Sequence, residues 1–327
     1  MFSTSTQRKY WTFSGETELA TTRGEANTRY IQTHGAHMME EQKIKHFLTP
    51  EEERLICRQT EHVLREFCNI FQPPMPKCVL GTALCYFKRF YASTSVMDYY
   101  PKDIMLTCVY LACKVEEFNV SIGQFVGNLK GDREKFSNII LTFELLLMGK
   151  LHYHLTVHNP FRPLEGLLID IKSRCKMIED PEKLRAYAEA FVDKSVANTD
   201  ACLIFSPSQI ALAAVLTSAA QIGKDLGSYV TEILLHGAKS DELEKTNYQI
   251  KRITYMVKSQ KPLEKELVGR VQKKLMKCRN QDNNPDSEQY KRKLKEMLDE
   301  DEEQQTIKRT RISEEEKRRD KELLGVP

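Results

Sequence analysis

The sequence lacks a hydrophobic run long enough to cross a membrane. Its most apolar stretch, Ile210 to Ile222, is shorter than the roughly 20 residues that a spanning helix needs. Residues 1–13 are polar and aromatic, unlike the apolar core of a secretion signal. A formal net charge of only +3 gives no strong global attraction to nucleic acid or to an anionic membrane. We therefore expect a cytoplasmic or nuclear protein without a membrane partner.

The cysteines do not form the spacing of a metal cluster or a disulfide framework. There are nine, an odd number, and none stands in a C-x-x-C pair. Most lie among apolar residues of helical pattern, which predicts reduced thiols that pack as small apolar side chains. The clearest examples are Cys68, Cys85, Cys108, Cys113 and Cys202.

Motifs of enzymes that bind phosphate or zinc are also missing. The sequence contains no G-x-G-x-x-G, no P-loop spacing and no H-E-x-x-H. The best metal candidates are His152, His154 and His158, of which the last two would share a helix face if the helix continued that far. No acidic or cysteine companion lies near them, and the stretch runs into an Asn-Pro pair. We therefore predict neither catalysis nor a metal or other cofactor.

Strand signals are absent, whereas helix starts are frequent. No segment alternates strictly between apolar and polar residues, and no Asn-Gly or Asp-Gly hairpin occurs. Three segments place a hydroxyl residue at the cap position and Glu or Gln three residues later. They are Thr49–Glu52, Ser121–Gln124 and Ser206–Gln209. The sequence thus predicts an all-α protein.

One short repeated sequence pattern indicates that the chain contains two equivalent halves. The pattern P-x-x-I-x-L begins at Pro101 and again at Pro207, each time opening an apolar helix. The interval corresponds to one small domain. We expect the hinge between the halves near His158–Pro163, where two prolines interrupt helical continuation.

Two charged residues stand in otherwise apolar helical patterns. Lys114 lies beside the apolar stripe of residues 104–115, and Glu144 lies between Phe143 and Leu145 in a second such helix. Because a carboxylate among apolar residues needs a partner or a solvated edge, we expect one opposite pair. Spacing alone leaves two interpretations open, an ordinary half-buried or rim salt bridge and a surface built for docking.

Several long segments of the chain resemble the cyclin family. The blocks that match the cyclin box in order and spacing are Tyr86–Tyr91, Leu111–Asn119, Phe143–Leu147 and His152–Leu155. Further matching segments are Trp11–Ser14, Gln124–Leu129, Val157–Pro163 and Ser206–Ala211. The resemblance spreads over most of the first 225 residues. It is specific because the matching segments are long and keep their order.

The resemblance implies two tandem five-helix cyclin-box repeats with flanking N- and C-terminal helices. The implied boundaries are an N-terminal segment with a docking helix (1–48), a first repeat (49–159), a second repeat (160–260), a C-terminal helix (261–284) and a charged, largely disordered tail (285–327).

The resemblance also implies a function without catalysis by this chain. Cyclins bind and activate a cyclin-dependent kinase, and the segments above are most similar to cyclins of the CDK-activating kinase. The implied partners are that kinase's catalytic subunit, a RING-finger assembly subunit and the TFIIH core, in the nucleus. The implied substrates are kinase activation loops and the RNA polymerase II C-terminal repeat. Lys114 and Glu144 fall at the positions that bond to the kinase near its αC helix. Leu111, Val115, Met148 and Tyr153 fall at positions of apolar contact.

One departure from mitotic cyclins argues against recruitment of R-x-L motifs. Lys88 stands where mitotic cyclins carry an aspartate, and Arg65 stands where their substrate-docking patch has a tryptophan. Two alternatives remain: another transcriptional cyclin, and a DNA-binding protein similar to general transcription factor B. The latter would need a basic face and an N-terminal zinc ribbon, which this sequence does not show.

The two ends carry further expectations. We predict a helix with a docking face from Trp11 to Ile31. Leu263, Leu267, Val271 and Leu275 form the predicted stripe of the C-terminal helix. In the tail, Tyr290, Leu294 and Leu298 predict a short helix, and Asp299–Glu303 and Glu314–Lys321 predict disorder. The basic runs Lys308–Arg311 and Lys317–Arg319 are read either as nuclear import signals or as parts of a solvated tail.

Overall fold

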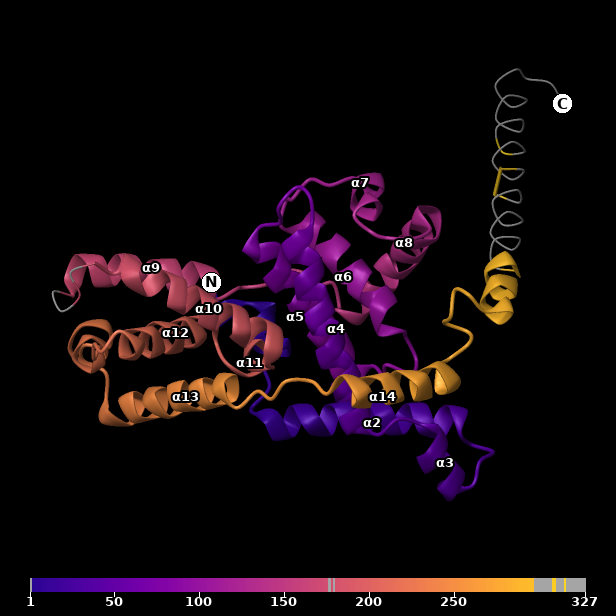
Figure 1. Ribbon diagram of the computed structural model, residues 1–327, viewed down its shortest axis with the longest axis horizontal. Coiled ribbons are helices and arrows are strands. Elements are labelled where there is room, and N and C mark those ends of the chain that lie inside the picture. The colour runs from indigo at the N-terminus through magenta and orange to yellow at the C-terminus, as the bar shows by residue number, and fades with distance from the viewer. Residues whose placement is uncertain (1, 176–177, 179, 297–307, 310–314, 316–327) are drawn as a thin grey trace, which may run out of the picture. The chain divides into compact units, whose positions relative to one another are not determined.

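The helices account for all regular structure in the described residues. A computed structural model describes residues 2–175, 178, 180–296, 308, 309 and 315 (Figure 1). Its elements are η1 (Phe2–Thr4), α1 (Thr6–Tyr10), α2 (Glu16–His34), α3 (Glu40–His46), α4 (Pro50–Ile70), α5 (Lys77–Ser93), α6 (Pro101–Val115), α7 (Ile122–Gly127), α8 (Arg133–Lys150), α9 (Phe161–Arg174), α10 (Glu182–Asn198), α11 (Ala201–Ile204), α12 (Pro207–Gln221), η2 (Tyr229–Leu234), α13 (Ser240–Lys258) and α14 (Lys265–Cys278). The prediction of an all-α protein is confirmed.

The chain forms two compact units, residues 1–278 and 279–327. In the second unit, residues 288–296 are helical and include Tyr290 and Leu294, as predicted. Leu298 lies outside the described residues. So do 299–303, 310–314 and 316–327, which contain Asp299–Glu303, all of Glu314–Lys321 except Glu315, half of the first basic run and all of the second.

The first unit contains two helical repeats with the same neighbour relations. In the first repeat α6 packs against α4, α5 and α8, and in the second α12 packs against α9, α10 and α13. Pro101 and Pro207 begin α6 and α12, so the repeated pattern P-x-x-I-x-L lies at the start of the central helix of each repeat. The second repeat differs by the short α11 before α12 and by a π-helical turn, η2, in place of a fourth α-helix.

The predicted helix starts are confirmed by their capping bonds. The Thr49 hydroxyl accepts from the N–H of Glu52 at 3.2 Å, and the Glu52 carboxylate accepts from the N–H of Thr49 at 3.0 Å. The same reciprocal pair occurs at Ser121 and Ser206. These bonds satisfy amide groups that the first turn of a helix leaves open.

The segment between the repeats is not a continuation of α8. The helix ends at Lys150, so the condition under which His154 and His158 would share a helix face is not met. His154 Nδ1 instead accepts from Trp11 Nε1 at 3.1 Å. No cluster of metal-ligating side chains occurs in the described part of the chain.

The hinge is held against α5 by a close approach at a glycine. Asn159 Nδ2 donates to Thr82 Oγ1 at 3.0 Å, and a Cβ at Gly81 would lie 2.3 Å from Asn159 Oδ1. At the other side, the N–H of His158 donates to Gln7 Oε1 at 2.6 Å. The N-terminal segment therefore helps fix the connection between the repeats.

Two terminal helices differ from their predicted limits. The helix predicted from Trp11 to Ile31 is interrupted at residues 11–15, where the N–H of Phe13 donates to the carbonyl of Leu203 at 2.8 Å. The segment predicted as a C-terminal helix, 261–284, is helical only from Lys265 to Cys278.

Only two of the four residues in the predicted apolar stripe of this C-terminal helix are buried. Leu263 precedes α14 and Leu267 is 36% exposed, whereas Val271 and Leu275 are buried. Val268 occupies the buried position instead. The buried face of the helix consists of Val268, Val271, Leu275 and Cys278, at steps of three and four residues.

All nine cysteines are free. Of the five singled out, four are buried and Cys202 is half-buried. Burial raises the pKa of the Cys68 and Cys113 thiols to about 12, so both remain protonated at neutral pH. No helix among the described residues is long and apolar enough to cross a membrane.

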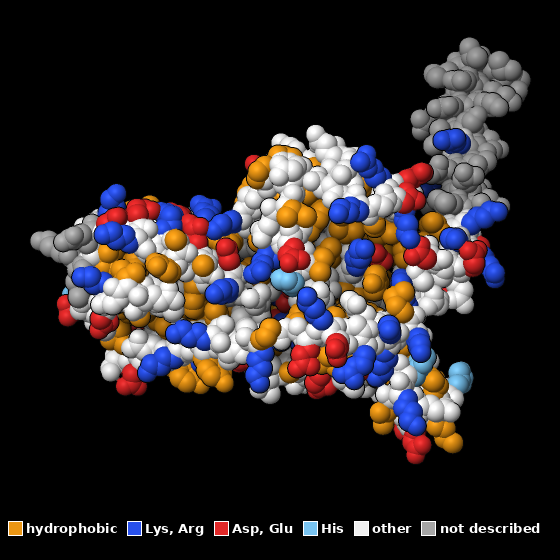
Figure 2. Space-filling model, in the orientation of Figure 1, with side chains coloured by type: hydrophobic (Ala, Val, Ile, Leu, Met, Phe, Trp, Pro, Cys, Tyr) orange, Lys and Arg blue, Asp and Glu red, His pale blue; other side chains and the backbone are white. Residues whose placement is uncertain are grey.

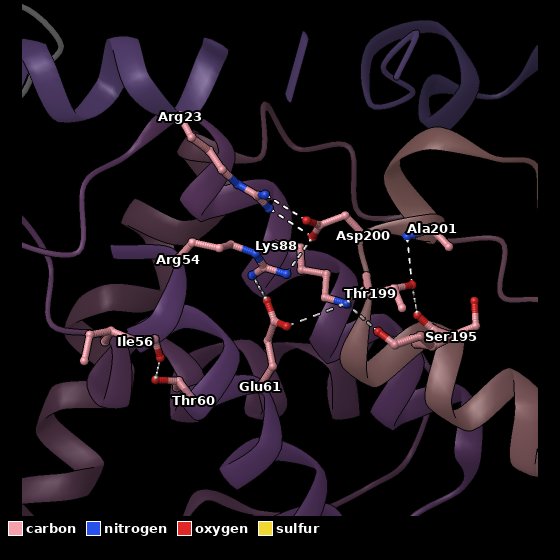
Figure 3. Close-up of polar contacts among 11 residues, drawn as sticks. Arg23, Arg54, Ile56, Thr60, Glu61, Lys88, Ser195, Thr199, Asp200 and Ala201 are labelled. Atoms are coloured by element: carbon pink, nitrogen blue, oxygen red, sulfur yellow. Dashed lines mark hydrogen bonds and ion pairs between the residues drawn. The ribbon is translucent and has the colours of Figure 1, made fainter. Parts of the chain in front are cut away.

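A network of charges, partly buried at its arginines and fully buried at Lys88, joins four segments of the first unit (Figure 3). Arg23 on α2 donates to both carboxylate oxygens of Asp200 at 2.8 and 3.0 Å, and Arg54 on α4 donates to Asp200 Oδ1 at 3.2 Å. Burial alone would raise the pKa of Asp200, but the charges of Arg54 and Arg23 outweigh it and hold the pKa well below its usual range.

The same network continues to α5. Arg54 Nη1 lies 2.7 Å from Glu61 Oε1, and Glu61 Oε2 lies 3.9 Å from Lys88 Nζ. Lys88 is 1% exposed and donates to the carbonyls of Val196 and Thr199 at the end of α10. The residue that departs from mitotic cyclins is thus a buried link between the two repeats.

We predict that Asp200→Ala lowers the free energy of unfolding by about 3 kcal/mol, the low end of the range for buried pairs, because it leaves two largely buried arginines without their shared carboxylate. Urea denaturation followed by circular dichroism measures the change. Glu40→Ala, which removes an exposed ion pair with Lys43 on α3, serves as control and should cost at most about 1 kcal/mol. Equal small losses in both variants would contradict the prediction.

A second prediction concerns Glu53, whose carboxylate is buried and accepts from Asn27 Nδ2 at 3.0 Å and from the Ser95 hydroxyl. Burial raises its pKa from 4.5 to about 7. The folded state therefore favours the protonated carboxyl group. The free energy of unfolding decreases as the pH rises from about 4.5 to about 7. Glu53→Gln should flatten the decline of the unfolding free energy between these pH values. Urea titrations at several pH values test it, and an unchanged slope would refute it.

Candidate functional site

The structure brings together the two charges that interrupt apolar helices. Lys114 Nζ, at the end of α6, lies 2.7 Å from Glu144 Oε1 and 2.8 Å from Oε2 on α8. The expected opposite pair is confirmed. The lysine side chain is 45% exposed and the glutamate side chain 15%. The pair therefore lies at the surface, with the carboxylate set deeper than the ammonium group.

Core packing between the two helices positions the pair. Cys113 on α6 and Phe143 and Leu147 on α8 are buried, and the two helices pack directly against each other. Lys114 also lies over the ring of Tyr110, 4.7 Å from its centroid. The ring limits the directions that the lysine side chain can take.

The four predicted apolar contact residues differ in accessibility. Leu111 is buried at 3% exposure and presents almost no surface to a partner. Val115 and Met148 are half-buried at the edge of the core. Tyr153 is 63% exposed, and its N–H donates to the carbonyl of Met148 at 2.9 Å. The accessible part of the predicted set is thus Val115, Met148 and Tyr153.

Sequence reasoning missed two leucines on the outer face of α8. Leu141 is 49% exposed and Leu145 is 65% exposed. Together with Met148 they follow a spacing of four and three residues, so they lie on one face. The signal was present in the run of apolar residues 145–148, because a helix that is apolar all round cannot bury every side chain against one neighbour.

Both helices of this surface end in left-handed backbone conformations. Glu117 follows α6 with a φ of 57°, and His152 and Tyr153 follow α8 with φ of 51° and 58°. Non-glycine residues rarely adopt this region. At α6 the turn is closed by a bond from the N–H of Phe118 to the carbonyl of Cys113 at 2.9 Å.

We call the surface formed by the Lys114–Glu144 pair with Leu141, Leu145, Met148, Val115 and Tyr153 the α6/α8 surface. It combines one charged pair with exposed apolar side chains. Such a surface is suited to bind another protein, because the apolar part supplies burial and the charged pair supplies direction. No group of side chains among the described residues could hold a metal there.

Comparison with known proteins assigns the chain to a family. Residues 30–156 match the model of the cyclin N-terminal domain, and residues 159–258 match that of the cyclin C-terminal domain. The chain belongs to the cyclin family. The model of the N-terminal domain covers α4–α8, and the model of the C-terminal domain covers α9–α13.

Individual relatives of this cyclin extend along most of its length. It is 47% identical to Cyclin-H of Xenopus laevis over 281 residues, which cover 85% of this chain and 87% of that protein. It is 34% identical to Probable cyclin-H of Echinococcus multilocularis, covering 88% of this chain and 95% of that protein.

A solved structure agrees with this assignment. This cyclin superposes on a chain of the CAK complex from Chaetomium thermophilum bound to ATP-gamma-S with a TM-score of 0.73 and 27% identity, covering 86% of this chain and 90% of that chain.

We predict that the Lys114–Glu144 pair contributes little to folding. A half-exposed pair typically contributes about 0.2–1 kcal/mol in a double-mutant cycle. The variants Lys114→Ala, Glu144→Ala and their combination, measured by urea denaturation, give that coupling energy. A coupling of several kcal/mol would assign the pair to the fold rather than to binding.

Proposed function

We propose that this cyclin is the regulatory subunit of a CDK-activating kinase, in which a bound cyclin-dependent kinase performs the chemistry. Three observations support the proposal: the match to both cyclin domains, the identity with two cyclin H proteins and the likeness to a chain of a CAK complex. The observation that carries it furthest is the α6/α8 surface. There a charged pair and accessible apolar side chains meet at the positions expected to contact the kinase.

The charged pair can form hydrogen bonds with both the C=O and the N–H groups of a partner backbone. The Lys114 ammonium group has three N–H donors, and the Glu144 carboxylate accepts several bonds. Their mutual contact leaves capacity on both, and 45% of the lysine side chain is exposed. Lys114 would donate to a kinase carbonyl and Glu144 would accept from a kinase N–H. Leu145, Met148 and Tyr153 would pack against apolar residues of the same segment.

Activation follows from selective binding. A surface that fits only the kinase conformation with its αC helix turned inward lowers the free energy of that conformation relative to the inactive one. The inward position is needed for the Lys-Glu pair that orients ATP. A differential binding energy of about 5.5 kcal/mol is enough to move a kinase from 1% to 99% active.

The proposal includes the further partners of the complex, its location and its substrates. The partners are the kinase subunit, a RING-finger assembly subunit and the TFIIH core, and the complex acts in the nucleus. Its substrates are the activation loops of cell-cycle kinases and, within TFIIH, the RNA polymerase II C-terminal repeat. The main alternative is another transcriptional cyclin, which the identity of the bound kinase distinguishes.

The DNA-binding alternative finds less support. On the face that Figure 2 shows, acidic and basic side chains are interspersed with hydrophobic ones rather than gathered into one basic strip. No zinc ribbon is formed by the described cysteines and histidines. A protein that binds DNA through its repeats needs a basic face along them.

We predict that wild-type protein binds and activates the recombinant catalytic subunit of the CDK-activating kinase, and that the Lys114→Ala/Glu144→Ala double change weakens both. The expected loss of binding free energy is about 2 kcal/mol or more, the range of interface hot spots. Calorimetry measures binding, and phosphate transfer to an activation-loop peptide measures activity.

The matched control is Glu40→Ala/Lys43→Ala, which removes an ion pair of the same 2.7 Å length from α3. It should leave binding and activation unchanged. If wild-type protein neither binds nor activates this kinase, the assignment to the CDK-activating kinase fails, and other transcriptional kinases are the next candidates. If only the double change has no effect, the docking role of the pair is refuted.

A further inference from the structure

A groove of about 730 Å³ lies on a different part of the first unit from the α6/α8 surface. Its walls come from α4, the end of α10, the segment between α13 and α14, and α14 itself. Its lining residues are Arg58, Gln59, Glu61, His62, Arg65, Glu66, Asn198, Gln260, Lys261, Pro262, Leu263, Lys265, Val268, Gly269 and Gln272.

The groove carries an excess of positive charge. Arg58, Arg65, Lys261 and Lys265 line it, and none of the four forms an ion pair with a described carboxylate. The two carboxylates of the lining are already engaged. Glu61 is held by Arg54 and Lys88, and Glu66 Oε1 lies 3.1 Å from His62 Nε2. Carboxylates outside the groove compensate two of the cations in part, since Asp193 interacts with Arg65 and Asp200 with Arg58. Lys261 and Lys265 are the cations most available to a ligand.

The interior behind the groove increases this excess. The buried network holds the cations of Arg23, Arg54 and Lys88 against only two carboxylates, those of Asp200 and Glu61. Burial and, secondarily, repulsion by Arg54 lower the pKa of Arg58, against a smaller opposite effect of the Glu61 and Asp200 carboxylates. An anion bound in the groove would relieve this repulsion.

Two of the arginines are prepared for such a ligand. Arg58 Nη2 donates to the carbonyl of Lys261 at 3.0 Å, which fixes its side chain and the loop together. The Nε of Arg65 is buried and has no hydrogen-bond acceptor among the described residues, so a ligand in the groove would reach this guanidinium group through its Nη atoms. A carboxylate or phosphate accepts from two N–H groups of one guanidinium group at the same time.

The remaining lining indicates a peptide rather than a nucleic acid. Amide side chains of Gln59, Asn198 and Gln272 line the groove, and such amides can pair with the N–H and C=O groups of an extended backbone. Pro262 and Leu263 add an apolar part. The lining contains no Phe, Tyr or Trp on which bases could stack, and the ring nitrogen Nε2 of its one imidazole, His62, faces Glu66.

We propose that this groove binds an extended acidic segment of a partner protein, with its carboxylates or phosphates on Arg58, Arg65, Lys261 and Lys265. The site is separate from kinase docking, because it is built from α4 and α14 rather than from α6 and α8. The four cations would repel the arginine of an R-x-L motif, which agrees with the arginine at position 65.

The full-length chain, without kinase, is titrated into a labelled peptide of alternating glutamate and serine, and fluorescence anisotropy follows binding. We expect saturable binding that weakens with added salt. The Arg65→Glu/Lys265→Glu double change should weaken it at least about tenfold, because like charges then face each other. Lys265→Glu alone, at an exposed position, gives a smaller loss in the same direction without a risk to folding.

The matched control is Lys273→Glu, a change of the same charge on α14 outside the groove; it should bind like wild type. An equal loss in this control, or equal binding of a peptide with glutamine in place of glutamate, would reduce the effect to general charge attraction and overturn the proposal. Tighter binding of an R-x-L peptide or of a single-stranded oligonucleotide at the same site would also overturn it.

Discussion

The carboxylate of Asp200 is the constraint on which the arrangement of the first unit depends. It lies just before α11 and is bound by arginines of α2 and α4, two helices that are distant from it in the sequence. Charges taken out of water must be paired closely, because an uncompensated charge in a buried site costs several kcal/mol. Only one relative position of α2, α4 and the chain before α11 satisfies both arginines. Lys88 adds the end of α10 to the same arrangement.

This internal fixation leaves the outer faces of the repeats free for binding, and the two surfaces differ in chemistry. The α6/α8 surface has one balanced ion pair among apolar side chains, so burial can supply most of the affinity there. The groove between α4 and α14 is polar and unbalanced, so its affinity must come from charge and be sensitive to salt. A partner suited to one surface would bind poorly at the other. One chain can thus bind a kinase and an acidic segment without competition.

Local signals in the sequence predicted the local features of this structure. Capping boxes at Thr49, Ser121 and Ser206 depend on residues three apart, and each formed as expected. The meeting of Lys114 with Glu144 was also predictable, because both interrupt strongly apolar helices. Contacts between distant segments were not predictable. Nothing near Arg23 indicates a partner 177 residues away, and the groove needs three separate segments to come together. These features depend on tertiary packing, which periodicity does not contain.

The ends of α6 and α8 show how packing overrides local preference at a binding surface. Left-handed backbone at a non-glycine residue costs of order 1 kcal/mol or more, and three such residues flank the α6/α8 surface. Glycine at these positions would remove the cost, yet Glu117, His152 and Tyr153 stand there. At Tyr153 the side chain is 63% exposed while its N–H is bound to Met148. The backbone turn therefore leaves an aromatic ring exposed, where a glycine would provide the turn without the ring. The strain is consistent with a residue retained for contact with a partner rather than for the stability of the helix end.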